Sequence, residues 1–153
     1  MSRTLTLGIV QFGACRDKGT NLDKIKKLLT KISADLIILP EYSMINITGL
    51  KPHEVYELSE NIEGNYVKEL SKIAIDNSTY MVMTMLEKSS KPPKVYNTAI
   101  LVAPSGDIKC VYRKIHLFDA YGYEESNYIE PGSEPSPVID IGKAKIAMSI
   151  CFD

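Results

Sequence analysis

The sequence contains few cysteines and histidines, and their placement excludes two classes of protein. The cysteines are Cys15, Cys110 and Cys151, an odd number, widely separated, in a 153-residue chain too large to need disulfide bonds. No Cys-x-x-Cys pair occurs, and His53 and His116 are isolated from the cysteines. The sequence therefore predicts neither a disulfide framework nor a zinc site, and we expect no metal or cofactor.

An excess of charge of one sign and a long hydrophobic run are also lacking. The chain has 18 Lys and Arg against 19 Asp and Glu, so it carries no electrostatic footprint for nucleic acid or an anionic membrane. No apolar stretch approaches the roughly 18 residues that span a bilayer. Residues 1–5 enter an alternating run directly, with no signal peptide. We expect a reduced, soluble, cytoplasmic protein without nucleic-acid or membrane partners.

The length and composition are those of an ordinary globular domain. Hydrophobic residues make up 44% and charged residues 24% of the chain. A chain of this size buries about 68–70% of its unfolded surface, which is enough for a hydrophobic core. There is no internal repeat and no interdomain linker. One domain, or a large piece of one, is predicted.

The first third of the chain has the pattern of a βαβ unit. Residues 4–12 alternate apolar and smaller or polar side chains, which is typical of a strand. Asn21 is a candidate helix N-cap, because apolar residues recur at helical spacing after it. Residues 36–39 form a short continuous apolar run. Strand, helix and buried strand together predict a parallel pair with a right-handed crossover.

The rest of the chain mixes hairpins with one more long helix. The predicted elements are a loop at 41–52, a short helix at 54–60, a longer helix at 63–76, strands at 80–86, 95–102 and 108–113, an ordered long segment at 114–137, and a final hairpin of 138–141 with 144–150. About seven strands and two long helices result. This predicts a layered α/β fold with helices on one face of the sheet, whose other face needs a partner layer.

Three polar residues stand at the exits of predicted strands. Glu41 follows the run 36–39, Lys114 follows the strand 108–113, and Cys151 ends the last apolar run. Taken singly, each has an ordinary structural interpretation: a capping carboxylate, a solvated cation and a small buried side chain. In open α/β sheets, however, functional residues gather at the carboxyl ends of strands. Their joint placement favours a chemical role.

Three stretches carry a resemblance to a known family. Residues 36–41, 112–117 and 149–153 resemble, in order and spacing, the signatures of the nitrilase, or carbon–nitrogen hydrolase, superfamily. Glu125-Ser126, followed by Glu-Pro-Gly at 130–132, is similar to the second glutamate and the Pro-Gly turn of that family. The resemblance extends from residue 7 to the end of the chain.

The resemblance implies an α-β-β-α sandwich, in which two mixed sheets face each other with helices outside. The family's domain continues well beyond its cysteine. Residues 1–153 are therefore expected to be the amino-terminal, incomplete part of a carbon–nitrogen hydrolase domain, truncated after the strand that carries the nucleophile. The resemblance also implies a homo-oligomer. We expect this part alone to be inactive and to self-associate, because apolar sheet surface stays uncovered.

The resemblance assigns a role to each candidate residue. Cys151 would be the nucleophile and Glu41 the general base, while Lys114 would stabilise the thiolate and the oxyanion together with the backbone N–H of Phe152. Glu125 would orient Lys114. This Glu–Lys–Cys triad implies hydrolysis of an amide, nitrile or ureido substrate through a thioester acyl-enzyme. In the complete, folded domain, contact with Lys114 is expected to give Cys151 the lowest thiol pKa of the three cysteines.

Other interpretations stay open. A papain-like hydrolase would pair Cys151 with His53 or His116, although no local signature of that kind is present. A non-catalytic binding or fragment protein with a nitrilase-like fold is the second alternative. A nucleotide-binding site is disfavoured, since no glycine-rich phosphate motif follows any strand. Whether Tyr42 lines the pocket is open, as is the substrate, with amides favoured by resemblance.

Overall fold

The computed structural model describes residues 4–30 and 32–153. The alternating run was expected to begin directly after the first residues, but residues 1–3 lie outside the described part of the chain. Residue 31, which falls within the predicted first helix, also lies outside it. The main sheet has the strand order β1-β2-β3-β4-β5. Its strands are β1 (Leu7–Ile9), β2 (Leu36–Ile38), β3 (Tyr80–Lys88), β4 (Val95–Val102) and β5 (Ile108–Arg113). The strands β1, β2 and β3 pair in parallel, and β4 pairs antiparallel with both β3 and β5. The predicted mixed sheet is therefore confirmed.

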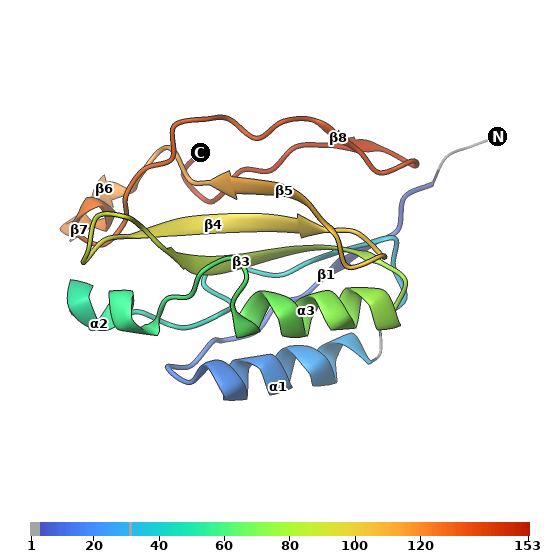
Figure 1. Cartoon of the computed structure of the whole chain (residues 1–153), viewed down its shortest axis with the longest axis horizontal. Helices are drawn as coiled ribbons and strands as arrows, with labels where there is room; N and C mark the ends of the chain where they lie inside the picture. Colours follow the sequence, from blue (N-terminus) through green and yellow to red (C-terminus); the bar gives the residue numbers. More distant parts are fainter. Residues whose placement is uncertain (1–3, 31) are drawn as a thin grey trace.

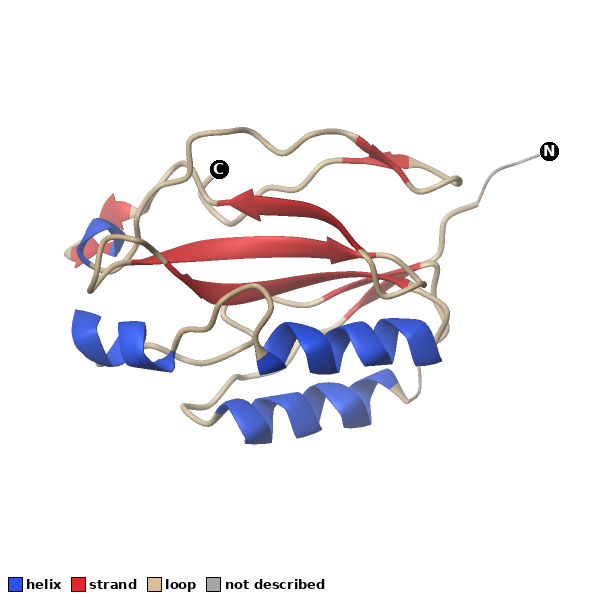
Figure 2. Cartoon of the chain, viewed as in Figure 1, coloured by secondary structure: helices blue, strands red, loops and turns tan. Residues whose placement is uncertain are grey.

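Three helices lie on one face of this sheet (Figures 1 and 2). They are α1 (Lys18–Leu29), α2 (Pro52–Leu58) and α3 (Asn65–Asp76). Ile25 of α1 and Leu70 of α3 are fully buried against sheet residues such as Ile37 and Met83. Burial of each such side chain contributes about 1.5–3 kcal/mol to folding. The predicted one-sided arrangement of helices is therefore confirmed.

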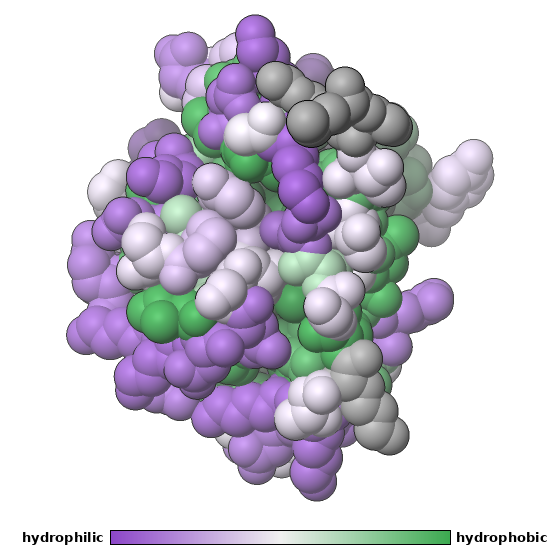
Figure 3. Space-filling model, turned by 90° about the vertical axis from the view of Figure 1, so that its right-hand side faces the viewer, coloured by the Kyte–Doolittle hydropathy of each residue, from purple (hydrophilic) through white to green (hydrophobic). Residues whose placement is uncertain are grey.

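The second face of the sheet is only partly covered. A hairpin of β8 (Ile139–Asp140) and β9 (Lys145–Ile146) lies over it, and Ile141 packs there against Leu36 and Leu101. Side chains of the edge strand β1 remain open, with Leu7 49% and Ile9 74% exposed. Figure 3 shows the side of the molecule that lies on the right in Figure 1, where hydrophobic patches interrupt the hydrophilic surface. The hairpin thus begins a second layer without completing it.

The long segment after β5 is ordered, as its aromatic residues predicted. It contains β6 (Asp119–Ala120), β7 (Tyr123–Glu124) and the 3-10 helix η1 (Glu125–Asn127). The strands β6 and β7 pair with each other. This segment lies at the end of the sheet toward which the β5 arrow points in Figure 1. It therefore borders the edge where the candidate residues emerge.

The first helix begins earlier than predicted, and Asn21 is not its N-cap. Asp17 is the N-cap, and its side chain accepts a hydrogen bond from the backbone N–H of Thr20 at 2.7 Å. The Asn21 side chain is fully buried and instead bonds the backbone of Cys15 and the carbonyl of Met44. Asn21 thus connects the loops that precede α1 and follow β2.

The last predicted strand is also shorter than expected. Of residues 144–150 only Lys145–Ile146 are β-strand. Further along, the N–H of Met148 donates to Ser136 Oγ at 3.0 Å, and that of Ile150 donates to Asp153 Oδ2 at 3.0 Å. Side chains therefore take the backbone donors that a strand ladder would use. The first strand is likewise limited to Leu7–Ile9, because its partner β2 ends two residues before Pro40.

Among the described residues, no helix is both long and apolar enough to cross a membrane.

We predict that residues 1–153 produced alone self-associate through the open face of β1. Ile9→Thr should shift the population toward monomer, because it removes the most exposed aliphatic side chain of that strand while keeping a β-branched residue. Light scattering coupled to size-exclusion chromatography measures the mass. Ile108→Thr, at a 41% exposed isoleucine of β5, is the matched control. A monomeric wild type, or an equal effect of both substitutions, would contradict the prediction.

Candidate active site

Two of the candidate residues emerge at the same edge of the sheet. β5 runs antiparallel to β4, which runs antiparallel to β3, so β5 has the direction of β2 and β3. Lys114 follows β5 directly, and Glu41 lies three residues beyond β2. Pro40 ends the pairing of β2 and turns the chain toward this edge. The strand order therefore brings together two residues that are far apart in the sequence.

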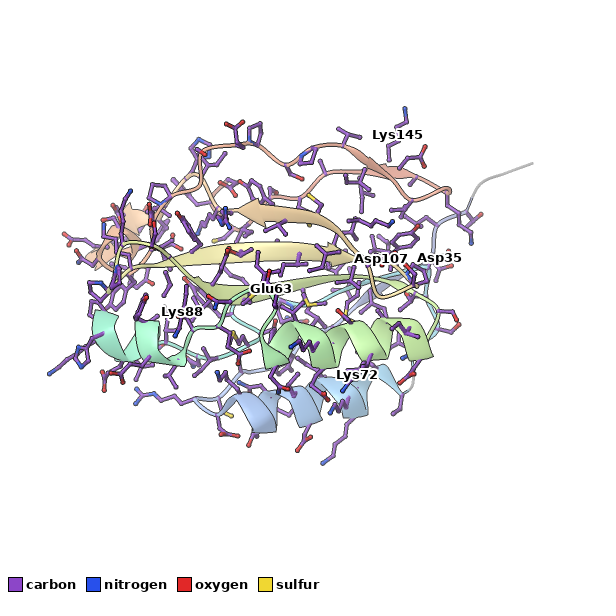
Figure 4. The ribbon with its side chains drawn as sticks, viewed as in Figure 1. Asp35, Glu63, Lys72, Lys88, Asp107 and Lys145 are labelled. Carbon is purple, nitrogen blue, oxygen red and sulfur yellow. The ribbon has the colours of Figure 1, made fainter. Side chains whose placement is uncertain are left out.

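Lys114 is the charged residue on which the site is built. Its side chain is 1% exposed, whereas Lys72, Lys88 and Lys145 lie on the outside of the fold (Figure 4). The ammonium Nζ lies 2.8 and 3.1 Å from the two carboxylate oxygens of Glu125. It also lies 3.4 Å from Oε1 of Glu41. A buried ammonium thus has two carboxylate partners.

The pKa of Lys114 is raised above its ordinary value. Burial by itself lowers the pKa, because it disfavours the charged form. The hydrogen bond to Glu125 and the negative charges of Glu41 and Glu125 act in the opposite direction and outweigh it. Lys114 is therefore an ammonium at neutral pH and a permanent positive charge at this edge of the sheet.

Glu125 is surrounded by hydrogen-bond donors. Besides Lys114, it accepts from the backbone N–H of Phe118 at 2.7 Å and from the hydroxyl of Tyr42 at 3.2 Å. The amide of Asn97 adds a longer contact of 3.4 Å. These donors occupy both oxygens of a side chain that is 1% exposed. Glu125 is therefore held in place from several sides.

Glu41 has a different environment. Its side chain is 26% exposed, and both of its contacts, from Asn97 at 2.8 Å and from Lys114, reach the same oxygen, Oε1. Within residues 4–30 and 32–153, no hydrogen bond reaches Oε2. One oxygen of Glu41 is thus held and the other is available to exchange protons.

Asn97 belongs to this cluster, although the sequence did not single it out. It is 1% exposed on β4, and its amide nitrogen donates to both Glu41 and Glu125. Its backbone carbonyl accepts from the N–H of Lys114 at 2.9 Å. Asn97 therefore bonds both carboxylates and the backbone of Lys114. A buried amide in a largely apolar strand was the only signal available in the sequence.

Cys151 lies in a turn beside these charges. Its backbone has φ of 49°, a left-handed conformation that is uncommon for a residue other than glycine. Partial burial raises the pKa of the Cys151 thiol, the charge of Glu41 raises it further, and Lys114 opposes them without cancelling the effect. In residues 1–153, therefore, Lys114 does not bring the pKa of the Cys151 thiol below its ordinary value, and the expectation of the lowest thiol pKa in the complete domain stays a prediction. The resting side chain is a thiol.

Phe152 follows in the same turn. Its backbone N–H donates to no residue that the structure describes, so it is available to a ligand. Its ring packs edge-on against Phe118, with the ring centroids 5.4 Å apart. Phe118 in turn donates its own N–H to Glu125. The turn that carries Cys151 is thus packed against the segment that holds Glu125.

The histidines stand apart from this cluster. His53 is exposed on α2. The ring of His116 lies 3.2 Å from the Asp153 carboxylate, and its side chain is 65% exposed. Neither histidine is among the groups that shift the pKa of the Cys151 thiol. The geometry therefore offers no support for a Cys–His pair.

A cavity of about 600 Å³ adjoins Glu41. Aromatic side chains of Tyr42, Tyr123 and Tyr128 line it, so Tyr42 does line the pocket. Its wall also includes Ile47, and Glu41 is the only ionisable carboxylate or cation in the lining. Among the described residues, no group of three or more His, Cys, Asp or Glu side chains could hold a metal ion.

Comparisons with known proteins identify the family of the chain. A family model described as carbon-nitrogen hydrolase matches residues 6–153. The chain is 36% identical over 137 residues to a nitrilase of Pyrococcus abyssi, covering 87% of this chain and 50% of that protein. It is 31% identical over 155 residues to the omega-amidase NIT2-B of Xenopus laevis, covering 96% of this chain and 54% of that protein. The chain thus spans about half the length of these relatives.

Solved structures share the fold. A carbon-nitrogen hydrolase from Helicobacter pylori G27 superimposes with a TM-score of 0.80 at 19% identity, over 97% of this chain and 51% of that one. An amidase from Nesterenkonia sp. AN1, in complex with butyramide, gives a TM-score of 0.78 at 24% identity, over 97% and 56%. The family model covers nearly all of the chain, and its mixed sheet matches these folds. The chain therefore belongs to the carbon–nitrogen hydrolase family, within the nitrilase superfamily.

Proposed function

We propose that the whole protein hydrolyses the carbon–nitrogen bond of small amides through a thioester on Cys151. The observation that carries this proposal is the buried Lys114 ammonium, held by Glu41 and Glu125 next to a turn that presents a thiol. The omega-amidase relative and the butyramide complex of the Nesterenkonia amidase favour amides over nitriles or ureido compounds. No cofactor or metal takes part.

The first step is attack by sulfur. Because the resting thiol is protonated, it needs a base, and the Glu41 carboxylate is the hydrogen-bond partner that acts on it. Glu41 accepts the thiol proton as the S–C bond forms at the amide carbonyl carbon. The carbonyl oxygen becomes an oxyanion, which Lys114 and the N–H of Phe152 stabilise. Charge thus develops where a positive group is already in place.

The second half of the reaction uses the same carboxyl group. Glu41 returns its proton to the departing nitrogen, the C–N bond breaks, and ammonia or an amine leaves a thioester on Cys151. Glu41 then removes a proton from water, whose oxygen attacks the thioester carbon. The C–S bond breaks, Glu41 gives its proton to the sulfur to regenerate the thiol, and a carboxylic acid is released. Every proton and bond is accounted for without a further reactant.

Glu125 and Asn97 support this chemistry without exchanging protons. Four different residues donate to Glu125, which in turn fixes Lys114 in place. Asn97 holds Oε1 of Glu41, the oxygen that Lys114 also contacts. The two carboxylates therefore have separate functions, one as an anchor and one as a base.

The cavity beside Glu41 is our candidate for the acyl group of the substrate. Its wall is formed mostly by uncharged side chains, including Tyr42, Tyr123 and Ile47.

We further propose that residues 1–153 are the amino-terminal part of the hydrolase domain and are inactive alone, since Leu7 and Ile9 leave the second sheet layer open. A homo-oligomer and a reducing, cytoplasmic location, where three free thiols persist, complete the proposal.

Glu41→Gln is predicted to speed alkylation of Cys151. The substitution removes the negative charge that raises the thiol pKa, so a larger fraction is thiolate at neutral pH. Iodoacetamide labelling followed by peptide mass mapping measures the rate, and Cys15 in the same chain is the internal standard. Glu124→Gln, at an exposed residue of β7, is the matched control. Unchanged labelling of Cys151 would show that Glu41 does not act on the thiol, and slower labelling would show that its charge is not what limits the thiolate fraction.

The same substitution is predicted to abolish turnover. Without a proton acceptor, kcat for ammonia release from butyramide by the whole protein should fall by about 10²- to 10⁴-fold, with a smaller change in KM. Glu124→Gln should retain the kcat of the wild type. If Glu41→Gln keeps a near-native kcat, another group is the base and the roles proposed here are wrong.

A further inference from the structure

The side chain of Asp153 is a hydrogen-bond hub two residues after Cys151. Although it stands in a surface turn, its side chain is only 5% exposed. Oδ2 accepts from the hydroxyl of Tyr112 at 2.6 Å and from the N–H of Ile150 at 3.0 Å. Oδ1 accepts from the N–H groups of Ile115 and His116 at 3.2 and 2.9 Å, and from the His116 ring at 3.2 Å. One carboxylate thus has five donors.

These donors come from two parts of the chain that the site needs together. The N–H of Ile150 belongs to the turn that carries Cys151, and the N–H of Asp153 closes this turn onto the carbonyl of Ile150 at 3.2 Å. Tyr112 is in β5, two residues before Lys114, and Ile115 and His116 directly follow Lys114. The carboxylate therefore joins the turn of the thiol to the segment of the ammonium.

This connection has a specific consequence for Cys151. Its φ of 49° is a conformation that an L-residue adopts only when its surroundings hold it there. The side chains of this turn contact other segments, the Cys151 thiol at Glu41 and the Phe152 ring at Phe118, and neither contact bonds the backbone of the turn. The Asp153 carboxylate bonds on both sides of the turn and supplies this restraint.

We propose that Asp153 is a positioning residue that sets the sulfur of Cys151 against Lys114 and Glu41. The inference rests on the proposed function of Cys151 as nucleophile. Asp153 is not itself a base for the reaction, because its two oxygens already accept five hydrogen bonds. It acts through the backbone of the turn.

The protonation state of Asp153 agrees with this role. Burial raises the pKa of its carboxyl group, but hydrogen bonds from Tyr112, His116 and Ile150 lower it more, and the net pKa is below the ordinary value. The carboxylate therefore stays charged, and the turn stays tied, throughout the neutral range.

The test is Asp153→Asn in the whole protein. In the asparagine variant an amide nitrogen, itself a donor, replaces one carboxylate oxygen, so it cannot accept the hydrogen bonds which that oxygen accepted. The turn should loosen, and the Cys151 thiol should become more hydrated and lie farther from Glu41. Its pKa should therefore fall toward that of a free cysteine. We expect iodoacetamide to label Cys151 several-fold faster at neutral pH, whereas misplacement of the sulfur lowers kcat by about 10²-fold.

Two matched variants complete the design. Asp140→Asn changes another turn carboxylate, which accepts only from the N–H of Gly142 at 2.7 Å, and should alter neither readout. Tyr112→Phe removes one of the five donors and should shift the Cys151 thiol pKa in the same direction by a smaller amount. Cys15, labelled in the same samples, reports any general loosening of the fold.

The outcomes separate the possible explanations. Faster labelling of Cys151 alone, with lower kcat, supports the positioning role. An unchanged Cys151 thiol pKa in Asp153→Asn overturns it. If Asp153→Asn unfolds and Cys15 also reacts faster, the result with Tyr112→Phe becomes the test. The positioning role is then overturned if Tyr112→Phe leaves the Cys151 thiol pKa unchanged. If the wild type hydrolyses no amide but labelling changes as expected, the proposed function fails while the positioning of Cys151 stands.

Discussion

A buried ammonium must be balanced by negative charge, and this requirement at Lys114 organises the carboxyl edge of the sheet. Its side chain is 1% exposed, and Glu125 and Glu41 lie 2.8 and 3.4 Å from it. Removing one partner of a buried ion pair costs about 3–5 kcal/mol, so the segments that supply the carboxylates are bound to this edge. The loop after β2 and the 3-10 helix η1 are placed by that constraint.

The same charge gives the two carboxylates different chemistry. Glu125 is enclosed by donors and serves as a fixed counter-ion, whereas Glu41 is 26% exposed and keeps one oxygen free. Cys151 and Tyr42 both stand in left-handed backbone conformations, with φ of 49° and 56°. Such conformations cluster at functional sites, where surrounding contacts maintain them. Here the contacts are the Asp153 hub on one side and the Tyr42 hydroxyl bond to Glu125 on the other.

Local patterns predicted most of the sheet and the strand exits. Strands 95–102 and 108–113 have the predicted bounds, because the turn that contains Gly106 specifies a hairpin and the two strands pair directly with each other. The length of the last strand was overestimated, since the backbone N–H groups of Met148 and Ile150 bond the side chains of Ser136 and Asp153. The bridging role of Asn97 and the raised thiol pKa of Cys151 depend on distances between strands, which no local pattern contains.

The central claim is that this charge cluster makes Cys151 form a thioester, and partitioning with hydroxylamine tests it most directly. Amides that share an acyl group but differ in the leaving amine would be hydrolysed by the whole protein with hydroxylamine present. A common thioester predicts one ratio of hydroxamate to carboxylic acid for all of them, because the amine has left before the ratio is decided. A ratio that changes with the leaving amine would contradict the thioester.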